Sequence, residues 1–310
     1  MVIIFFILNI LTFIICDVPR LPDHIKPLSY DLQLEVYLPG YSIEPQYFGI
    51  VSIELDIKRN VNNIILHANK NIIFSQTVLE FSNPDESSHY TISPIKITDS
   101  DEFQQVKLHF DKTIPAGKAL LTIEYSSNFN NDMMGFYNFS YKNEAGKLQY
   151  GALTQFEPYS ARSAIPCFDE PEFKAIWKVD IYHPKGTNAL SNTPGIRTTP
   201  YGAGSEKWEN FTYTTFEETP EMSSYLLAFA ISEYVYESAE TKSGILVNVH
   251  APFESTFLIK SRLGGVSMEA GFSNVAILDI SHFFRKSYLR ERPKGSDPGP
   301  SEQKTRDLTT

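Results

Sequence analysis

The stretch VSIELDIK, residues 51–58, alternates strictly between apolar and polar side chains. Val51, Ile53, Leu55 and Ile57 share one face of an extended chain, because successive side chains of a strand point to opposite faces. The polar residues between them share the other face. This period of two predicts a half-buried strand, with one face against a core and one face in water.

The same period recurs on both sides of this stretch. Upstream, YDLQLEVYLP at residues 30–39 alternates in the same way, and turn clusters such as SNPDE at 82–86 separate further short apolar segments. These further candidate strands are residues 63–67, 106–110, 120–125, 177–182, 208–214, 225–231 and 245–251. Many short strands without a short internal repeat predict a mostly β fold, an antiparallel β saddle or sandwich, over residues 17–236.

The pattern changes in the last quarter of the chain. Between residues 267 and 289 there is no proline, and Phe272, Ala276, Ile280 and Phe284 fall four apart, which predicts one amphipathic helical segment. Residues 290–310 contain one aliphatic residue, three prolines and mixed charges. That composition predicts a disordered tail.

The N-terminal residues predict a secretory route. The uncharged run VIIFFILNILTFII at residues 2–15 is shorter than the roughly 20 residues of a spanning helix and is typical of a signal-peptide core, covering residues 1–16. An uncleaved anchor and a buried strand are the alternatives. The sequons at Asn138 and Asn210 are usable only on that route, so we expect a secreted or cell-surface glycoprotein.

The net charge bears on the kind of partner, and the cysteine count bears on disulfide formation. The net charge is -10 without a basic block, which argues against nucleic acid as a partner. If Cys16 leaves with the signal peptide, Cys167 is the only thiol, and no internal disulfide forms.

Residues 151–175, GALTQFEPYSARSAIPCFDEPEFKA, carry a specific resemblance. They resemble the signature of the aminopeptidase N family of zinc metallopeptidases, T-Q-x-E-P, then A-R, then P-C-F-D-E-P-x-x-K-A. The opening LPDHIKPLSYDL at 21–32 and PEMSSYLLAF at 220–229 are also similar to that family. The resemblance implies a large antiparallel β saddle, followed at residues 244–289 by the truncated start of a thermolysin-like catalytic domain.

The resemblance also implies a substrate-binding pair, Gln155 and Glu157, in a loop that reaches the active site. A peptide's α-amino group is largely protonated near neutral pH, and a carboxylate holds it by charge-assisted hydrogen bonds. The expected ligand is therefore a peptide N-terminus. Read without the resemblance, Glu157 is a loop carboxylate before Pro158.

The segment PCFDEP at residues 166–171 allows sharper interpretations. Cys167 is either a nucleophile or a small buried apolar residue, and no histidine is placed beside it, which favours burial. Asp169 and Glu170 are adjacent, so they face opposite ways in an extended segment and make a poor acid/base pair. We predict instead that they pack against Arg162 as a structural clasp.

A zinc site of this family needs H-E-x-x-H on a helix, where two histidines bind the metal and the glutamate activates water. None of the 7 histidines is followed by Glu, and none has a second histidine four residues away. The family's G-A-M-E-N loop is missing too. GVSMEA at residues 265–270 is superficially similar to it but better resembles the helix that precedes that loop.

These observations leave three hypotheses. The first is a non-catalytic or truncated relative without catalytic or metal-binding residues, which binds no cofactor although its full-length relatives bind zinc. The second is a fragment of a full-length zinc metalloaminopeptidase that removes N-terminal residues from peptides, and the third is an unrelated all-β adhesion module. An apolar helix at 266–289 without its catalytic domain also predicts self-association or a protein partner.

Overall fold

The structure is a computed structural model that describes part of the 310-residue chain. The described residues are 19–42, 44, 46–83, 88–100, 102–143, 145–201, 210–240, 246–252 and 277–279. The expected signal peptide, the expected tail and residues 265–270 lie outside them. No helix among the described residues is long and apolar enough to cross a membrane.

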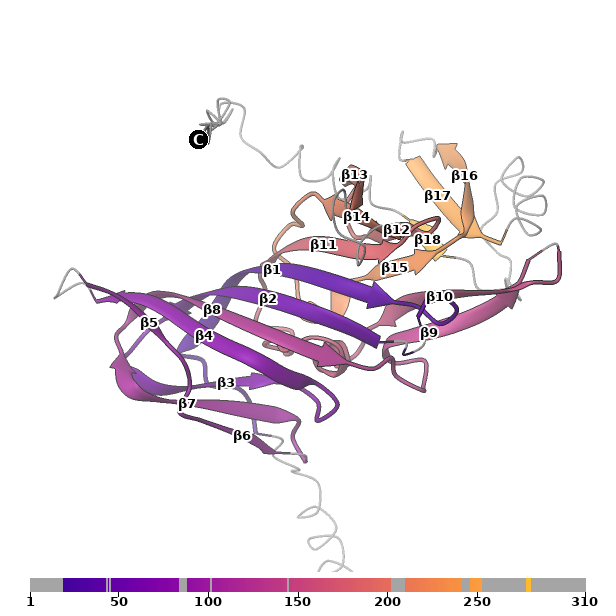
Figure 1. Cartoon of the computed structure of the whole chain (residues 1–310). Helices are drawn as coiled ribbons and strands as arrows, with labels where there is room; N and C mark the ends of the chain where they lie inside the picture. The colour runs from indigo at the N-terminus through magenta and orange to yellow at the C-terminus, as the bar shows by residue number, and fades with distance from the viewer. Residues whose placement is uncertain are drawn as a thin grey trace, which may run out of the picture.

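Eight strands form the largest sheet (Figure 1). Their spatial order is β13 (Gly195–Tyr201), β14 (Phe211–Phe216), β11 (Ile176–Pro184), β1 (Ile25–Tyr37), β2 (Gln46–Ile57), β8 (Gly117–Ser127), β4 (Ile73–Asn83) and β5 (Ser88–Ile92). Neighbouring strands are antiparallel, with one exception: β1 and β11 run parallel, with Tyr30 opposite Trp177. The mostly β, mainly antiparallel fold predicted from the alternation is confirmed.

The alternating stretch that begins at Val51 lies at the centre of this sheet. Val51 pairs with Leu32 of β1 on one side and with Ile123 of β8 on the other, and all three side chains are fully buried. The polar residues between them face the opposite side of the sheet, and Ser52 shares a 3.0 Å hydrogen bond with Thr122 there. The period of two therefore separates the core face from the outer face.

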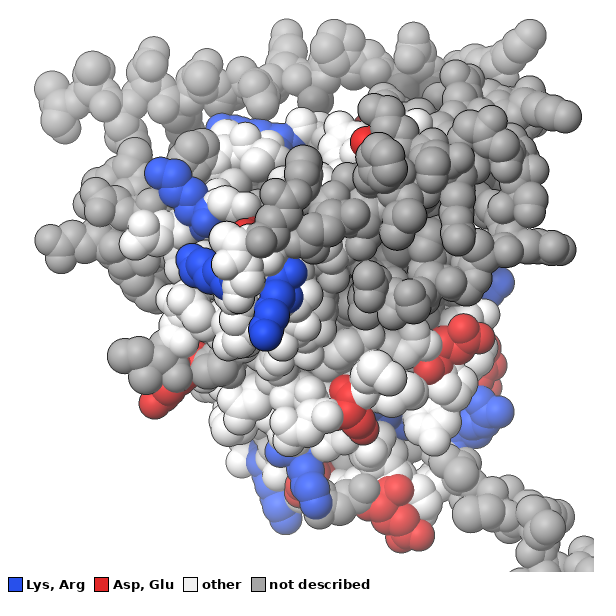
Figure 2. All heavy atoms as spheres, turned by 90° about the vertical axis from the view of Figure 1, so that its right-hand side faces the viewer, with Lys and Arg blue, Asp and Glu red and all other residues white. Residues whose placement is uncertain are grey.

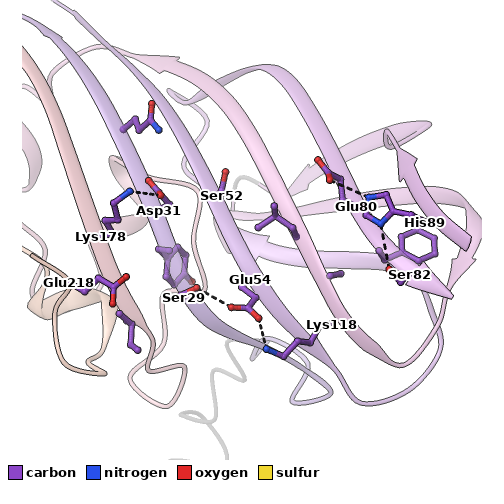
Figure 3. A pocket seen from close by; sticks show the side chains of 16 residues that line it. Ser29, Asp31, Ser52, Glu54, Glu80, Ser82, His89, Lys118, Lys178 and Glu218 are labelled. Atoms are coloured by element: carbon purple, nitrogen blue, oxygen red, sulfur yellow. Dashed lines mark hydrogen bonds and ion pairs between the residues drawn. The ribbon is translucent and has the colours of Figure 1, made fainter. Parts of the chain in front are cut away.

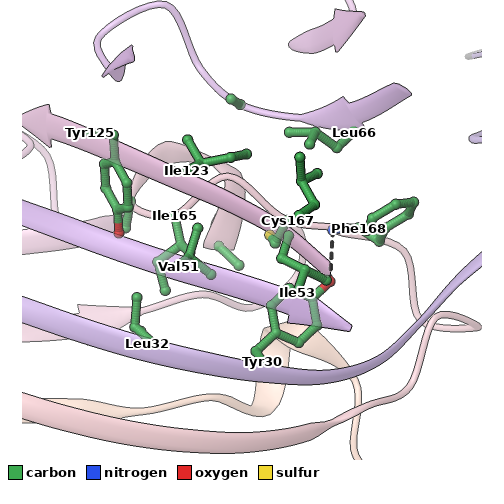
Figure 4. Packing of buried hydrophobic residues seen from close by; sticks show 14 of the residues in the cluster. Tyr30, Leu32, Val51, Ile53, Leu66, Ile123, Tyr125, Ile165, Cys167 and Phe168 are labelled. Atoms are coloured by element: carbon green, nitrogen blue, oxygen red, sulfur yellow. Dashed lines mark hydrogen bonds between the residues drawn. The ribbon is translucent and has the colours of Figure 1, made fainter. Parts of the chain in front are cut away.

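A smaller sheet covers the core face. Its order is β3 (Val61–His67), β7 (Gln105–Ile114) and β6 (Lys96–Ser100), and Figure 4 shows Leu66 of β3 opposite Val51 and Ile53 of the large sheet. Ile165, Cys167 and Phe168 enter the same cluster from a loop rather than from a strand (Figure 4). The core is thus closed partly by the segment in which the sequence predicts a clasp.

Two further sheets lie at the other end of the molecule (Figure 1). One has the order β12 (Asn188–Ser191), β15 (Phe229–Ser232), β10 (Leu148–Gln155) and β9 (Gly135–Lys142). The other has the order β16 (Val235–Glu240), β17 (Leu246–Ala251) and β18 (Ile277–Asp279). The described residues also form 3-10 turns at Ala161–Ser163 and Ser224–Leu226.

The helix predicted over residues 267–289 is wrong where the structure describes it. Ile277–Asp279 are extended and pair antiparallel with Asn248–His250 of β17. Because β17 offers an open edge, pairing satisfies the backbone there and overrides a helical spacing of apolar residues. The other residues of the predicted helix lie outside the described part of the chain.

Candidate functional site

The loop after β10 presents the two residues predicted to bind substrate. Gln155 is the last residue of β10, and both Gln155 and Glu157 are exposed, while Phe156 between them is buried. Gln155 Nε2 donates a 3.3 Å hydrogen bond to the carbonyl oxygen of Glu157, so the structure brings the two residues together. The Glu157–Pro158 peptide bond is cis.

Contacts on the buried side of this loop hold its backbone in place. The Phe156 ring packs edge-on against Phe229, with centroids 5.9 Å apart, and the amide of Ser160 donates to the carbonyl of Phe156 at 2.7 Å. Gly135, which pairs with Gln155, has a φ of 70°, and a Cβ there would lie 2.3 Å from Ser163 Oγ. Only glycine therefore lets β9 begin this close to the turn behind the loop.

The clasp predicted between Arg162 and Asp169 is confirmed. Arg162 Nε lies 2.9 Å from Asp169 Oδ2, and an Arg162 terminal nitrogen donates to the Asp169 carbonyl at 2.7 Å. The other carboxylate oxygen of Asp169 accepts a 2.6 Å hydrogen bond from Ser224 Oγ. Ser224 could not be predicted from the sequence, because it lies 55 residues from Asp169 and no local pattern links them.

Glu170 does not pack against Arg162, so the prediction was wrong for this residue. Its carboxylate accepts a 2.8 Å hydrogen bond from the amide of Leu21 and lies 3.1 Å from Arg20 Nη1. Asp169 and Glu170 thus point to different partners, as expected for adjacent residues of an extended segment. Glu170 fixes the entry of the chain into β1.

Cys167 is a buried core residue, as predicted. It is fully buried, and burial together with the Asp169 charge holds the pKa of its thiol well above the usual range. Its backbone pairs with His67, whose Nδ1 faces the amide of Asp169 at 3.3 Å. Burial and the nearby Arg162 charge lower the pKa of His67 to about 3, so the imidazole is neutral near pH 7.

Both sequon asparagines lie on the surface. Asn138 is exposed in β9, the edge strand of its sheet, and Asn210 is exposed just before β14. The backbone carbonyl of Asn210 accepts a 2.7 Å hydrogen bond from the amide of Lys185, which leaves the side chain accessible. The exposure of both asparagines is compatible with the predicted glycosylation.

A separate groove lies on the outer face of the large sheet (Figure 3). It measures about 670 Å³, and its lining contains neither Gln155 nor Glu157. Each of its lysines is paired: Lys178 with Asp31 at 2.9 Å, and Lys118 with Glu54 at 2.6 Å. The groove therefore has a mixed polar and apolar lining crossed by ion pairs, and it does not include the predicted substrate-binding loop.

Charged side chains are unevenly distributed over the surface of the described residues. On the face in Figure 2, basic side chains gather at the upper left of the described surface, and charges of both signs are mixed lower down. No group of three or more His, Cys, Asp or Glu side chains is arranged to hold a metal ion among the described residues.

Most of this chain is similar to one protein family and to several named proteins. Residues 26–226 match the family described as Peptidase M1 N-terminal domain. Aminopeptidase N of Haemonchus contortus is 35% identical over 230 residues, which are 73% of this chain and 23% of that protein. Endoplasmic reticulum aminopeptidase 1 of Rattus norvegicus is 32% identical over 236 residues, 75% of this chain and 24% of that protein.

A third relative comes from Caenorhabditis elegans. Its puromycin-sensitive aminopeptidase is 33% identical over 231 residues, 74% of this chain and 23% of that protein. The alignments thus cover most of this chain but less than a quarter of each of these relatives.

Proposed function

The chain belongs to the peptidase M1 family, and from this premise we propose that it forms the N-terminal β domain of an aminopeptidase-like protein, in which Gln155 and Glu157 bind the α-amino group of a peptide. The observation that carries the proposal is the exposed pair at the end of β10, where a carboxylate and an amide project from one fixed loop. Glu157 supplies the charge, and Gln155 supplies a neutral donor and acceptor beside it.

The expected affinity is low. An exposed ion pair contributes roughly 0–1 kcal/mol, because water screens the charges and both side chains lose freedom. The loop alone therefore selects for a charged amine without holding a peptide tightly. The test must therefore detect weak binding and identify the residues that take part in it.

The test is a titration of the whole chain, followed by NMR, with Ala-Ala-Ala and with its N-acetylated form. We expect shifts at residues 155–159 for the free amine alone, and loss of these shifts in Glu157→Gln. Glu102→Gln is the matched control, since Glu102 is also exposed and lies outside the loop. Equal binding of the acetylated peptide, or undiminished binding by Glu157→Gln, would refute the proposal.

We also propose that the chain alone does not hydrolyse peptides. The described residues do not fit a zinc site: both ring nitrogens of His183 contact threonine hydroxyls, at 2.8 and 2.9 Å, and His67 Nδ1 faces a backbone amide. The sequence also lacks H-E-x-x-H. The purified chain should release no amino acid from aminoacyl substrates, whereas one tightly held zinc with chelator-sensitive turnover would contradict this.

The second candidate function is that of a piece of a complete zinc metalloaminopeptidase. The chain matches less than a quarter of each of three relatives that bear aminopeptidase names, which favours this alternative. A transcript that continues in frame beyond the codon for Tyr288 into H-E-x-x-H would establish it. A stop after residue 310 in every transcript would exclude it.

We propose the secretory pathway as the route of the chain. The proposal is supported by the apolar run at residues 2–15 and by the exposure of Asn138 and Asn210. Mass spectrometry should find a mature N-terminus near Asp17 and glycans on both asparagines. Intact Met1 on an unglycosylated product would contradict the route.

The apolar segment at residues 266–289 supports a further proposal, that the chain self-associates or binds a protein partner through it. Light scattering should then show a larger species for the whole chain than for a chain ending at Pro252, which keeps β16 paired with β17. Two monomers would exclude self-association through this segment.

A further inference from the structure

The outer face of the large sheet carries a group of charged side chains that the proposed function does not use. Asp31 of β1 lies opposite Lys178 of β11 in the parallel pairing, and Asp180 is the next residue of β11 on the same face. Lys178 Nζ lies 2.9 Å from Asp31 Oδ2 (Figure 3) and 3.8 Å from Asp180 Oδ2. Two carboxylates therefore share one lysine.

Asp180 is withdrawn from water, since its side chain is 4% exposed. Its Oδ2 accepts a 2.8 Å hydrogen bond from the hydroxyl of Tyr213, whereas Oδ1 is buried and has no hydrogen-bond partner among the described residues. Oδ1 of Asp31 is also buried without such a partner in the described part of the chain. A buried carboxylate is costly unless donors and a counter-charge satisfy it. The pair is therefore suited to a ligand that brings both a positive charge and several donors.

The cluster is open to a ligand on one side. The side chains of Asp31 and Lys178 are 41% and 38% exposed, so Asp180 forms the inner end of the cluster and these two residues form its outer end. Both outer residues line the groove of about 670 Å³ on this face. The groove lining holds more carboxylates than lysines, namely Asp31, Glu54, Glu80 and Glu218 against Lys118 and Lys178. This excess attracts positive charge to the groove.

Aromatic rings lie on the other side of Asp180. Tyr182 follows on the same face of β11 and is paired with Tyr213 of β14. The two half-buried rings have centroids 4.6 Å apart, and the Tyr213 hydroxyl holds Asp180. Such rings stack on guanidinium groups, which are planar and weakly hydrated.

We propose that this face binds an arginine side chain from an extended segment of a partner protein, with the guanidinium between Asp31 and Asp180. A guanidinium has five N–H donors in a fixed plane, so one group can donate to Oδ1 of both carboxylates. The residues next to this arginine would lie along the groove that begins at Asp31. A metal ion fits less well, because no third His, Cys, Asp or Glu joins the two carboxylates in a metal-binding arrangement within the described residues.

The experiment is an NMR titration of the whole chain with three pentapeptides, Ala-Ala-Xaa-Ala-Ala, in which Xaa is arginine, lysine or glutamine. Each peptide is N-acetylated and C-amidated, so that none has the free amine proposed to bind at Glu157. We expect the arginine peptide to shift the signals of residues 31, 178 and 180. It should bind roughly 3- to 10-fold more tightly than the lysine peptide, the gain from one more charge-assisted hydrogen bond, and the glutamine peptide should not bind.

Two variants test the carboxylates. Asp31→Asn and Asp180→Asn should each weaken the arginine peptide about 10-fold, because each removes a charged acceptor but keeps the shape of the side chain. Asp31 is half-exposed, so its replacement tests the site even if Asp180→Asn fails to fold. Asp56→Asn is the matched control, since Asp56 lies on the same face in β2 but outside the groove lining, and it should bind as the wild type does.

Equal binding of the arginine and lysine peptides would overturn the choice of a guanidinium. Undiminished binding by folded Asp31→Asn, or equal losses in Asp31→Asn and Asp56→Asn, would overturn the site. Shifts at residues 31 and 180 with Ca²⁺, without any response to the arginine peptide, would assign the cluster to a metal instead. These outcomes leave the proposed role of Glu157 untouched, because acetylated peptides do not test it.

Discussion

Both carboxylate oxygens of Asp169 accept hydrogen bonds, although the side chain is almost completely buried. Oδ2 accepts from the backbone amide and from Nε of Arg162, at 3.2 and 2.9 Å, and Oδ1 accepts from Ser224 Oγ at 2.6 Å. The exposed fractions of the Arg162 and Asp169 side chains are 11% and 1%. Both charges are thus withdrawn from water and depend on each other.

Arg162→Ala should therefore destabilise the fold strongly. The change leaves the Asp169 carboxylate buried without its counter-charge, which costs about 3–5 kcal/mol. Urea unfolding followed by circular dichroism measures the loss. Arg197→Ala, at an exposed arginine of β13, is the control and should stay within about 0.5 kcal/mol of the wild type. A similar loss for both variants would mean that the clasp is not what stabilises the fold.

His183 should make the stability depend on pH. Burial lowers the pKa of His183 from 6.5 to about 4. The unfolded chain then binds more protons than the folded chain between these values, so the free energy of unfolding falls as the pH drops from about 6.5 to about 4. The contribution of one histidine is limited to about 1.4 kcal/mol per pH unit.

Replacing the histidine isolates this contribution. His183→Gln removes the titration, so its unfolding free energy should fall less steeply with falling pH than that of the wild type. Asn62→Gln is the control and should keep the wild-type slope, because it exchanges one exposed amide side chain for another that does not titrate. Parallel slopes for the wild type and His183→Gln over this pH window would contradict the prediction.

At the scale of elements, Tyr30 connects β1 to the clasp. Its ring stacks on Trp177 of β11 with centroids 3.8 Å apart, and its hydroxyl accepts a 3.0 Å hydrogen bond from the amide of Phe168 (Figure 4). Tyr30→Phe keeps the stack but leaves that buried amide without its partner. We expect a loss of about 1–3 kcal/mol in the free energy of unfolding.

Tyr236→Phe is the matched control for this loss, since it removes a hydroxyl from a side chain that is 59% exposed. Thermal unfolding of both variants separates the effect of the hydrogen bond from that of the hydroxyl itself. If Tyr30→Phe is as stable as the wild type, another group satisfies the Phe168 amide.

The central strands could be predicted from the sequence because each has one wet face. The alternation of residues 51–58 reappears in β2, which ends at Ile57, and that of residues 30–39 reappears in β1. The strand expected at 225–231 begins only at Phe229, after a 3-10 turn at Ser224–Leu226. Its apolar run has no period, because β15 is buried on both faces, so the sequence could not place its start.

Pairing between distant strands could not be predicted in the same way. Nothing local to β1 or β11 indicates that they run parallel, and β9 and β10 escaped notice because glycine and polar residues interrupt their pattern. The loop residues Gln155 and Glu157 were found only through the family resemblance.

At the scale of the whole molecule, the segment of residues 166–171 joins parts of the chain that are far apart in sequence. Asp169 contacts Ser224 and His67, Glu170 contacts Leu21, and Pro171 accepts a 2.7 Å hydrogen bond from Ser223. These contacts connect the segment that leads into β1, the small sheet and the turn before β15. The segment therefore has a structural role in this chain that follows from its contacts alone.

The parallel pairing of β1 with β11 has a consequence for synthesis on the ribosome. Tyr30 and Trp177, which lie opposite each other in this pairing, are separated by 147 residues, so at about 5–20 residues per second translation needs on the order of ten seconds to deliver one after the other. Until then β1 can pair with β2 but has an unpaired edge on its other side, and such edges recruit other strands. We therefore expect slow codons between β1 and β11 to lower the yield of folded protein, because they lengthen the time for which this edge stays unpaired.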